Sequence, residues 1–597
     1  MKLYILNNRI TFLYIFVILQ LLHSQIINQP YLNNCDLSFT KHINTWYWTG
    51  GFDLYNKNST GLNYYIRDRF SSNLQLPVSQ EQEWRDENNL SAYFYKTSNN
   101  INYGLYSTSW LLSDQLTSSS SRYSNHKLGI KADYTYNTNY IINPYLGYQR
   151  SENKSLIDYG WNLGLTGKIY DYPLGDYKSD LTLESNYDLY EDRRNNLNNI
   201  TVNITTKFSE FTEDSLSIGY MRDSKQYYLQ IEEDNYFLND LLVNNRYLFN
   251  YLNYQFSDRS FFKLNTIIIS KKIEDNDPYD KNERNILRIE NFIYYKYLLK
   301  NMNILLGIQM HQENQDNLGI QTDNISKQTG FKSNILYNFN ENNKLDFMFD
   351  YIKFQYDTPD TSTNHDDRDE QRFIGSLKYY RFFNSLLSMN VYFYSNIFHR
   401  MYILANKSLN NNWNRIFRLG SEVIYKNQGW ANVLRTQILA NYTAYDFEDL
   451  FPTTKSFVFR KYILSDSLTI PLHYSIHAGI HSRLELEDKG KFYKDTFAQA
   501  ILQSTRSIYY DFFLHNKQIF LFDIHTGITF YKRLDWQHIP YKRIIRDIYS
   551  FTPYIRITYL LHKNLQFFTY FARTEVKDKG SKNLSYFNGR LSLHYFF

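Results

Sequence analysis

Apolar and polar side chains alternate with a period of two along many segments of the chain. Every second side chain is apolar and most intervening ones are polar in residues 127–136, 180–189, 200–208, 303–311 and 468–477. Successive side chains of a β-strand point to opposite faces, so this pattern predicts strands with one apolar and one polar face. Apart from residues 10–22, no comparable stretch has helical spacing.

Short polar turns interrupt the predicted strands at regular intervals, and longer polar segments lie between them. The short turns are expected near Asn58, Asn99, Thr138, Pro173, Glu213, Asp258, Asn301, Glu341, Asn384, Asn427, Asp466, Asn516 and Lys563. The longer segments are residues 274–283, 357–371, 405–415, 488–495 and 574–585. Thirteen turns that join two strands each predict about 26 strands, or 22 to 24 if a turn is misplaced.

The last nine residues, 589–597, form an alternating strand that ends on an aromatic side chain. Leu591, Leu593, Tyr595 and Phe597 share its apolar face. This ending resembles the closing strand of bacterial outer-membrane β-barrels, where it is the signal read by the barrel-assembly machinery. The resemblance implies an all-β, transmembrane, antiparallel up-and-down β-barrel in the outer membrane of a Gram-negative bacterium. Its expected partners are outer-membrane lipid and the assembly machinery, with short turns in the periplasm and long loops outside.

The N-terminal segment predicts export. Lys2 and Arg9 precede the apolar residues 10–22, and the small Ser24 and then Gln25 follow. This is the pattern of a secretory signal peptide cleaved between Ser24 and Gln25, and the apolar run is short for a membrane-spanning helix. The expected organisation is a signal peptide at 1–24, a short periplasmic lead-in at 25–44 and a barrel at 45–597.

The composition agrees with a barrel. The chain has 58 Tyr and 43 Phe in 597 residues, and aromatic residues suit strands and form girdles at membrane interfaces. The lone Cys35 excludes an intrachain disulfide, and a net charge of +5 gives no indication of a nucleic-acid partner. A soluble β-sandwich or propeller would also alternate, but it would not explain the aromatic excess, the terminal strand and the unequal loops together.

The charged residues predicted to line the lumen carry both signs, whereas a strongly selective pore shows one dominant sign. They therefore predict an ordinary polar wall. The lumen-lining candidates are Lys127, Lys131, Asp133, Asp180, Glu184, Asp188, Lys207, Asp346, Asp350, Arg418, Glu422, His473, His477 and Arg556.

Other candidate chemistry is weak. The acidic segments 274–280 and 357–370 could bind Ca²⁺ through carboxylates, but they lack EF-hand spacing, so solvated loops are favoured. His473 and His477 would lie about 13 Å apart on one strand, too far for one metal ion. The chain contains no Gly-x-Ser-x-Gly and no His-Glu-x-x-His motif. We therefore predict neither a cofactor, a metal site nor an enzyme.

The size of the barrel limits the function. Twenty-six tilted strands enclose a lumen on the order of 50 Å across, which side chains cannot fill. The short lead-in leaves no room for the plug domain of a TonB-dependent transporter. Two interpretations remain: a porin-like channel for solutes, occluded by its own loops, or a conduit or scaffold barrel that houses or anchors a periplasmic or surface partner. The second resembles barrels that surround a multihaem cytochrome, although no Cys-x-x-Cys-His occurs in this chain.

Overall fold

The computed structural model describes residues 33–596 apart from 58–60, 77–81, 116–120, 154–155, 210–211, 233–234, 277–280, 320–321, 360–365, 451–454, 520, 563 and 580–582. The predicted signal peptide with its cleavage pair Ser24 and Gln25, and the terminal Phe597, lie outside these residues. The described chain contains 28 β-strands and one short 3-10 helix, η2 (Ala405–Asn410).

The first fourteen strands are β1 (Asn34–His42), β2 (Thr45–Asn56), β3 (Leu62–Gln75), β4 (Glu83–Ser98), β5 (Ile101–Asp114), β6 (Ser121–Tyr136), β7 (Tyr140–Asn153), β8 (Leu156–Leu174), β9 (Tyr177–Tyr190), β10 (Arg194–Ser209), β11 (Thr212–Glu232), β12 (Asn235–Ser257), β13 (Ser260–Asn276) and β14 (Lys281–Leu298). The remaining strands are β15 (Met302–Leu318), β16 (Asn324–Asn340), β17 (Asn343–Asp357), β18 (Arg368–Phe382), β19 (Leu387–Tyr402), β20 (Asn412–Asn427), β21 (Trp430–Tyr445), β22 (Phe457–Pro471), β23 (Ile476–Tyr493), β24 (Ala498–Ile519), β25 (Phe522–Gln537), β26 (Arg543–His562), β27 (Leu565–Asp578) and β28 (Leu584–Phe596).

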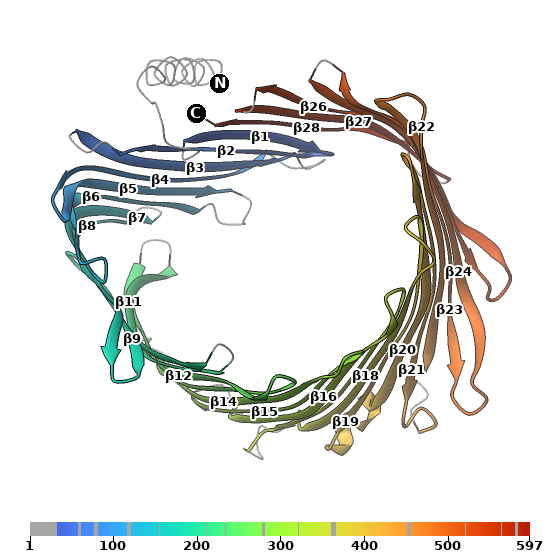
Figure 1. Cartoon of the computed structure of the whole chain (residues 1–597), viewed down its shortest axis with the longest axis horizontal. Coiled ribbons are helices and arrows are strands. Elements are labelled where there is room, and N and C mark those ends of the chain that lie inside the picture. Colours follow the sequence, from blue (N-terminus) through green and yellow to red (C-terminus); the bar gives the residue numbers. More distant parts are fainter. Residues whose placement is uncertain are drawn as a thin grey trace.

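The strands form one closed antiparallel sheet. Each strand pairs with its neighbours in the chain, and β1 pairs with β28, so the strands form a ring (Figure 1). The closing pair runs from Asn34 opposite Phe596 to Lys41 opposite Gly589. Closure leaves no unpaired sheet edge, as a membrane-spanning sheet requires. The all-β, antiparallel barrel implied by the resemblance of the terminal strand is confirmed.

The number of strands exceeds the expected 26 by two. The thirteen expected short turns join the 26 strands β2 to β27 in consecutive pairs. One further strand, β1, precedes them, and one, β28, follows them. The preceding strand, β1, lies within residues 25–44, which we expected to be a periplasmic lead-in. That expectation was wrong for Asn34–His42, because β28 needs an antiparallel partner before the ring can close.

The connections differ in length at the two ends of the barrel. We call the end with the β4–β5, β12–β13 and β20–β21 connections the short-turn end, since each of these turns has two residues. The opposite, long-connection end carries the longest loops, residues 358–367, 403–411 and 446–456. The expected turn at Asp466 is displaced to residues 472–475, because β22 continues as far as Pro471.

One face of the sheet is apolar near the short-turn end. Ile293, Ile308, Phe331, Tyr351 and Phe373 lie directly opposite one another on five successive strands, β14 to β18. Exposed aromatic residues gather on this face beside the short turns, where they match an interfacial girdle. Examples are Tyr136, Tyr177, Phe208, Tyr254, Phe256, Tyr295 and Phe339. We call this surface the apolar face.

Toward the long-connection end the same face becomes polar. On β15 the alternate positions Ile304, Leu306, Ile308 and Met310 are followed by Gln312 and Asn314. A transmembrane strand needs about 9–11 residues, whereas these strands commonly have 14–20. The strands therefore extend beyond the apolar band on the side of the long connections.

The C-terminal strand contributes to the apolar face. Leu591 lies opposite Phe39 of β1, and Leu593 lies opposite Leu37. Tyr595 follows on the same face of β28, opposite Cys35. The predicted apolar face of the terminal strand thus lies at the seam that closes the ring.

Candidate functional site

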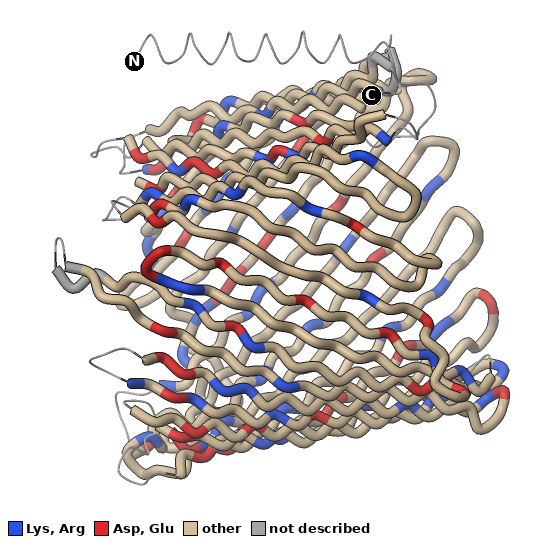
Figure 2. Tube along the Cα trace, turned by 90° about the vertical axis from the view of Figure 1, so that its left-hand side faces the viewer, with Lys and Arg blue, Asp and Glu red and all other residues tan. Residues whose placement is uncertain are grey.

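The second face of the sheet, which we call the polar face, carries almost all of the predicted lumen-lining residues. The strand registers place thirteen of the fourteen on this one face, alternating with residues of the apolar face: Lys127, Lys131, Asp133, Asp180, Glu184, Asp188, Lys207, Asp346, Asp350, Arg418, Glu422, His477 and Arg556. Both signs of charge occur over the whole height of the wall (Figure 2).

Several of these charges neutralise one another. The Lys127 ammonium on β6 lies 3.0 Å from a carboxylate oxygen of Asp188 on β9, and Lys131 lies 3.0 Å from Asp133. Glu422 of β20 forms an ion pair with Arg435 of β21. Mutually paired charges do not create a field of one sign. The pairing agrees with the prediction of an ordinary polar wall.

His473 is the exception among the candidates. It lies in the turn at 472–475, where its N–H donates to the carbonyl oxygen of Ile476, and it is exposed. The prediction that His473 and His477 share one strand was therefore wrong. His477 is the second residue of β23 and lies opposite His515 of β24.

Tyrosine rings lie flat across glycines on the polar face. At Gly219, Gly420 and Gly527 a Cβ atom would overlap the ring of a tyrosine from the next strand. Each such ring carries its hydroxyl group to a polar group one strand further on. The bonded pairs, with Oη-to-oxygen distances, are Tyr247 to Thr201 (2.7 Å), Tyr392 to Gln437 (3.4 Å) and Tyr554 to Asp511 (3.0 Å).

The same arrangement recurs between β5 and β9. Tyr106 crosses Gly129 and Gly147 to reach Asn162 of β8, with 3.0 Å between the oxygens. Tyr145 crosses Gly164 to reach Asn186 of β9, at 2.8 Å. The tyrosine excess thus serves the polar face as well as the membrane interface. Composition alone does not show this, because the Gly–Tyr pairs appear only once the register is known.

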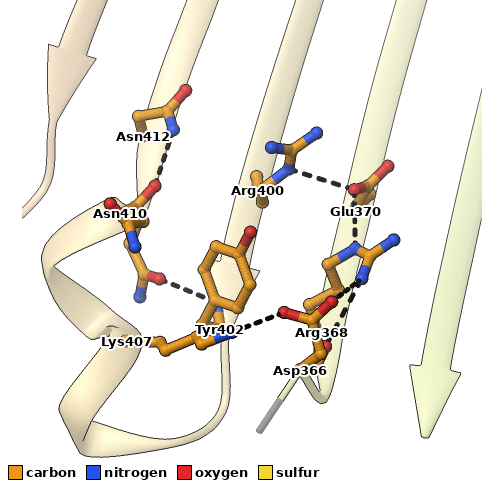
Figure 3. A network of polar contacts seen from close by, with 9 residues as sticks. Asp366, Arg368, Glu370, Arg400, Tyr402, Lys407, Asn410 and Asn412 are labelled. Carbon is orange, nitrogen blue, oxygen red and sulfur yellow. Dashed lines mark hydrogen bonds and ion pairs between the residues drawn. The ribbon is translucent and has the colours of Figure 1, made fainter. Parts of the chain in front are cut away.

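The acidic loops considered for Ca²⁺ are engaged by cations of the chain. Asp366 accepts from the Lys407 ammonium at 2.9 Å and forms an ion pair with Arg368 at 3.1 Å (Figure 3). Glu370 accepts from the guanidinium groups of Arg368 and Arg400, both at 3.1 Å. This network joins the 358–367 connection to η2. The Lys407 hydrogen bond, above all, lowers the pKa of Asp366 below its ordinary value.

The other acidic segment is similarly occupied. Lys272 lies 2.5 Å from Glu274 and 3.0 Å from Glu283 across the β13–β14 pair. Among the described residues, no three His, Cys, Asp or Glu side chains are grouped so that they could hold a metal ion. Glu274 and Glu283 are therefore engaged by a cation of the chain, and they belong to strands β13 and β14 and not to a loop as expected.

Comparisons with known proteins give similarity in structure alone. No protein-family model and no curated protein matches the sequence. Solved structures that resemble the chain include the siderophore receptor PirA from Pseudomonas aeruginosa (7% identity, 96% of this chain and 81% of that chain, TM-score 0.36). Another is the alcaligin outer-membrane receptor FauA from Bordetella pertussis (9% identity, 82% of this chain and 85% of that chain, TM-score 0.36). A third is the copper transporter OprC (6% identity, 95% of this chain and 80% of that chain, TM-score 0.39). Similarity at this level does not extend to function.

The architecture itself indicates the location. A closed antiparallel barrel with an apolar face, an aromatic girdle and unequal connections is the arrangement of Gram-negative outer-membrane proteins. The fold therefore supports the outer-membrane location expected from the sequence. Within the described residues, no helix is both long and apolar enough to span a bilayer.

Proposed function

We propose that the chain forms the wall of a passage for material across the outer membrane, with the polar face lining the lumen. A closed sheet has one face inside and one outside. The apolar face, with Ile308 and Phe331 on adjacent strands, suits lipid. The polar face, with paired charges such as Lys127 and Asp188, suits water. Outer-membrane lipid and the barrel-assembly machinery are the partners this proposal requires.

The width of the barrel relative to its loops decides between the two forms of passage. Twenty-eight strands about 4.8 Å apart and tilted by about 40° enclose a ring about 55 Å across. The longest connection within the barrel, between Tyr445 and Phe457, has 11 residues. A loop of that length, running out and back, reaches about 18 Å from the wall. By this reach, the connections between the described strands cannot cover the centre of the ring.

This single observation favours a conduit or scaffold barrel whose lumen is filled by a partner protein. An open lumen of this diameter would let folded proteins through, which would abolish the barrier function of the outer membrane. The alternative is the porin-like channel occluded by its own loops. The mixed, largely paired charges of the polar face favour neither form, so the loop lengths carry the preference.

Conductance of the purified barrel in planar bilayers tests the proposal. We expect either one very large conductance or none from the barrel alone, and a reduction of that leak when a co-purified partner is added back. Small, reproducible current steps from the chain alone would favour the porin-like channel. A chain that does not insert into bilayers at all would contradict a passage of either kind.

A further inference from the structure

A row of hydrogen-bond donors crosses the polar face near the short-turn end. Arg590 of β28 lies opposite Tyr570 of β27, which lies opposite Arg556 of β26. Arg556 in turn lies opposite His525 of β25. We call these four residues the basic row. Because neighbouring strands are about 4.8 Å apart, the two arginine backbones are about 10 Å apart, and both long side chains can reach the space between them.

The basic row lines a pocket in the wall. Its volume is about 420 Å³, and Asp511, Tyr554 and Phe568 complete the lining. The Arg590 guanidinium lies over the Phe568 ring, 5.6 Å from its centroid. The pocket thus combines two guanidinium groups, an imidazole and two phenol groups with one carboxylate.

The guanidinium groups of the pocket have no carboxylate partner within 4 Å among the described residues. Elsewhere on the polar face arginines are commonly paired: Arg400 lies 3.1 Å from Glu370, and Arg533 lies 2.9 Å from Asp535. Like charges that line one pocket repel each other, so an anion bound in the pocket would lower the electrostatic energy of both guanidinium groups.

The one carboxylate of the pocket is already engaged. Gly527 leaves space for the Tyr554 ring to lie flat on the wall. The Tyr554 hydroxyl donates to Asp511 at 3.0 Å and lies 3.1 Å from His525 Nε2. The nearby Asp523 is bound to His515 Nε2 at 2.6 Å. Because the Tyr554 hydroxyl donates its proton to Asp511, it accepts from His525 Nε2–H, so the buried and unpartnered Nδ1 of the neutral imidazole is an acceptor and not one of the free donors of the pocket. The two guanidinium groups therefore give the pocket a net positive charge and hydrogen-bond donors for which the described residues supply no carboxylate.

We propose that this pocket binds the phosphate group of a small solute. The two guanidinium forks and the Tyr570 hydroxyl offer more donors than the two oxygens of a carboxylate can accept, whereas a phosphate presents three or four oxygens. The inference rests on the proposed function only in placing the polar face in the lumen. Free phosphate and a phosphate ester share the chemistry that the pocket recognises.

Calorimetric titration of the folded, detergent-solubilised barrel with inorganic phosphate and with glycerol phosphate tests this site. The variants are Arg556→Gln, Arg590→Gln and Tyr570→Phe. The control is Arg418→Gln, because Arg418 also lies on the polar face, has no carboxylate within 4 Å among the residues that the structure describes, and lies outside the pocket. The gel mobility of unboiled samples establishes that each variant is folded.

We expect phosphate to bind the parent barrel with a millimolar or tighter dissociation constant. Each arginine variant should weaken binding about tenfold or more, since a charged hydrogen bond contributes about 1.5–3 kcal/mol. The Arg418 control should bind as the parent does. Glycerol phosphate binding alone would identify an ester as the ligand and would equally support the site.

The proposal would be overturned if neither phosphate compound bound the folded parent, or if the arginine variants and the control bound phosphate equally. Preferential binding of succinate over phosphate would also overturn it. Because binding is measured in detergent, the outcome is independent of conductance. A barrel that binds phosphate but carries no material would refute the passage and leave the site intact.

Discussion

A lysine series along β15 would show which face of the sheet contacts lipid. Ile308 lies on the apolar face between Ile293 and Phe331, and its side chain is 47% exposed. The adjacent Gln309 lies on the polar face, opposite Gly330. Gln312 lies on the same face as Ile308, beyond the apolar residues of the strand. The three positions thus separate the effect of the face from that of the depth in the membrane.

The expected magnitudes follow from these places. A lysine on the lipid face near the bilayer centre costs about 2–4 kcal/mol, and the cost falls to about 0–1 kcal/mol near the interface. Ile308→Lys should therefore lower the ratio of folded to unfolded protein about 30- to 700-fold. Gln312→Lys should have a small effect, and Gln309→Lys should have almost none, because it adds one charge to a wetted wall.

Urea titration of the barrel refolded in lipid vesicles, read by gel mobility of unboiled samples, measures these differences. The order Ile308→Lys, then Gln312→Lys, then Gln309→Lys in loss of stability supports the assignment of the faces. Equal losses at Ile308 and Gln309 would refute it. A larger loss at Gln309 would show that the faces are reversed.

Three further changes test separate parts of the structure. Ser38→Pro removes a backbone N–H from β1, the shortest strand, so the ring should fail to close. The variant should then lose the difference in gel mobility between unboiled and boiled samples. A normal difference in mobility would show that β1 is dispensable. Gly219→Val should displace the Tyr247 ring and weaken the wall by about 1–3 kcal/mol in the same urea titration, and an unchanged midpoint would contradict the packing. The pKa of Asp366 is lowered in the folded state, so its ion pair with Lys407 stabilises the loops fully at pH values above the ordinary aspartate pKa. This stabilisation is lost as the pH falls through the lowered pKa of Asp366. Hydrogen exchange of residues 403–411, corrected for its intrinsic pH dependence, should rise in that acidic range, whereas Lys407→Gln should raise it at neutral pH as well; a loop insensitive to both would contradict the network.

The period of two predicted the strands and, together with the turn residues, most of the turns, whereas the barrel was implied by the resemblance of the terminal strand. It specifies which residues share a face, and turn residues mark where strands end. The prediction failed at Asp466, because Pro471 ends β22 instead of interrupting a strand.

The strand β1 was missed for a different reason. Counting two strands for each short turn leaves out β28, the strand that follows the last long connection, although the alternating pattern of β28 was recognised in the sequence. Adding that strand gives an odd number, and an antiparallel ring in which every strand follows its neighbour needs an even one. The parity of the ring therefore requires a strand before Thr45, and β1 provides it.

The contacts of the polar face could not be predicted in the same way. Arg556 was recognised as a wall residue, but its neighbours Arg590 and His525 lie 34 and 31 positions away in the chain, and only the register brings them together. Likewise, Gly527 and Tyr554 acquire meaning only as partners on adjacent strands. Alternation determines the face of a residue, whereas pockets depend on strand alignment.

Accessibility along β15 tests the central claim most directly. Single nitroxide spin labels at Ile308, Gln309, Met310 and His311, in a Cys35→Ser background, report contact with lipid through oxygen and contact with water through a polar nickel reagent. We predict that Ile308 and Met310 favour oxygen, while Gln309 and His311 favour the nickel reagent, with a period of two. Equal exposure of all four labels to water would contradict a lipid-embedded barrel with a polar lumen.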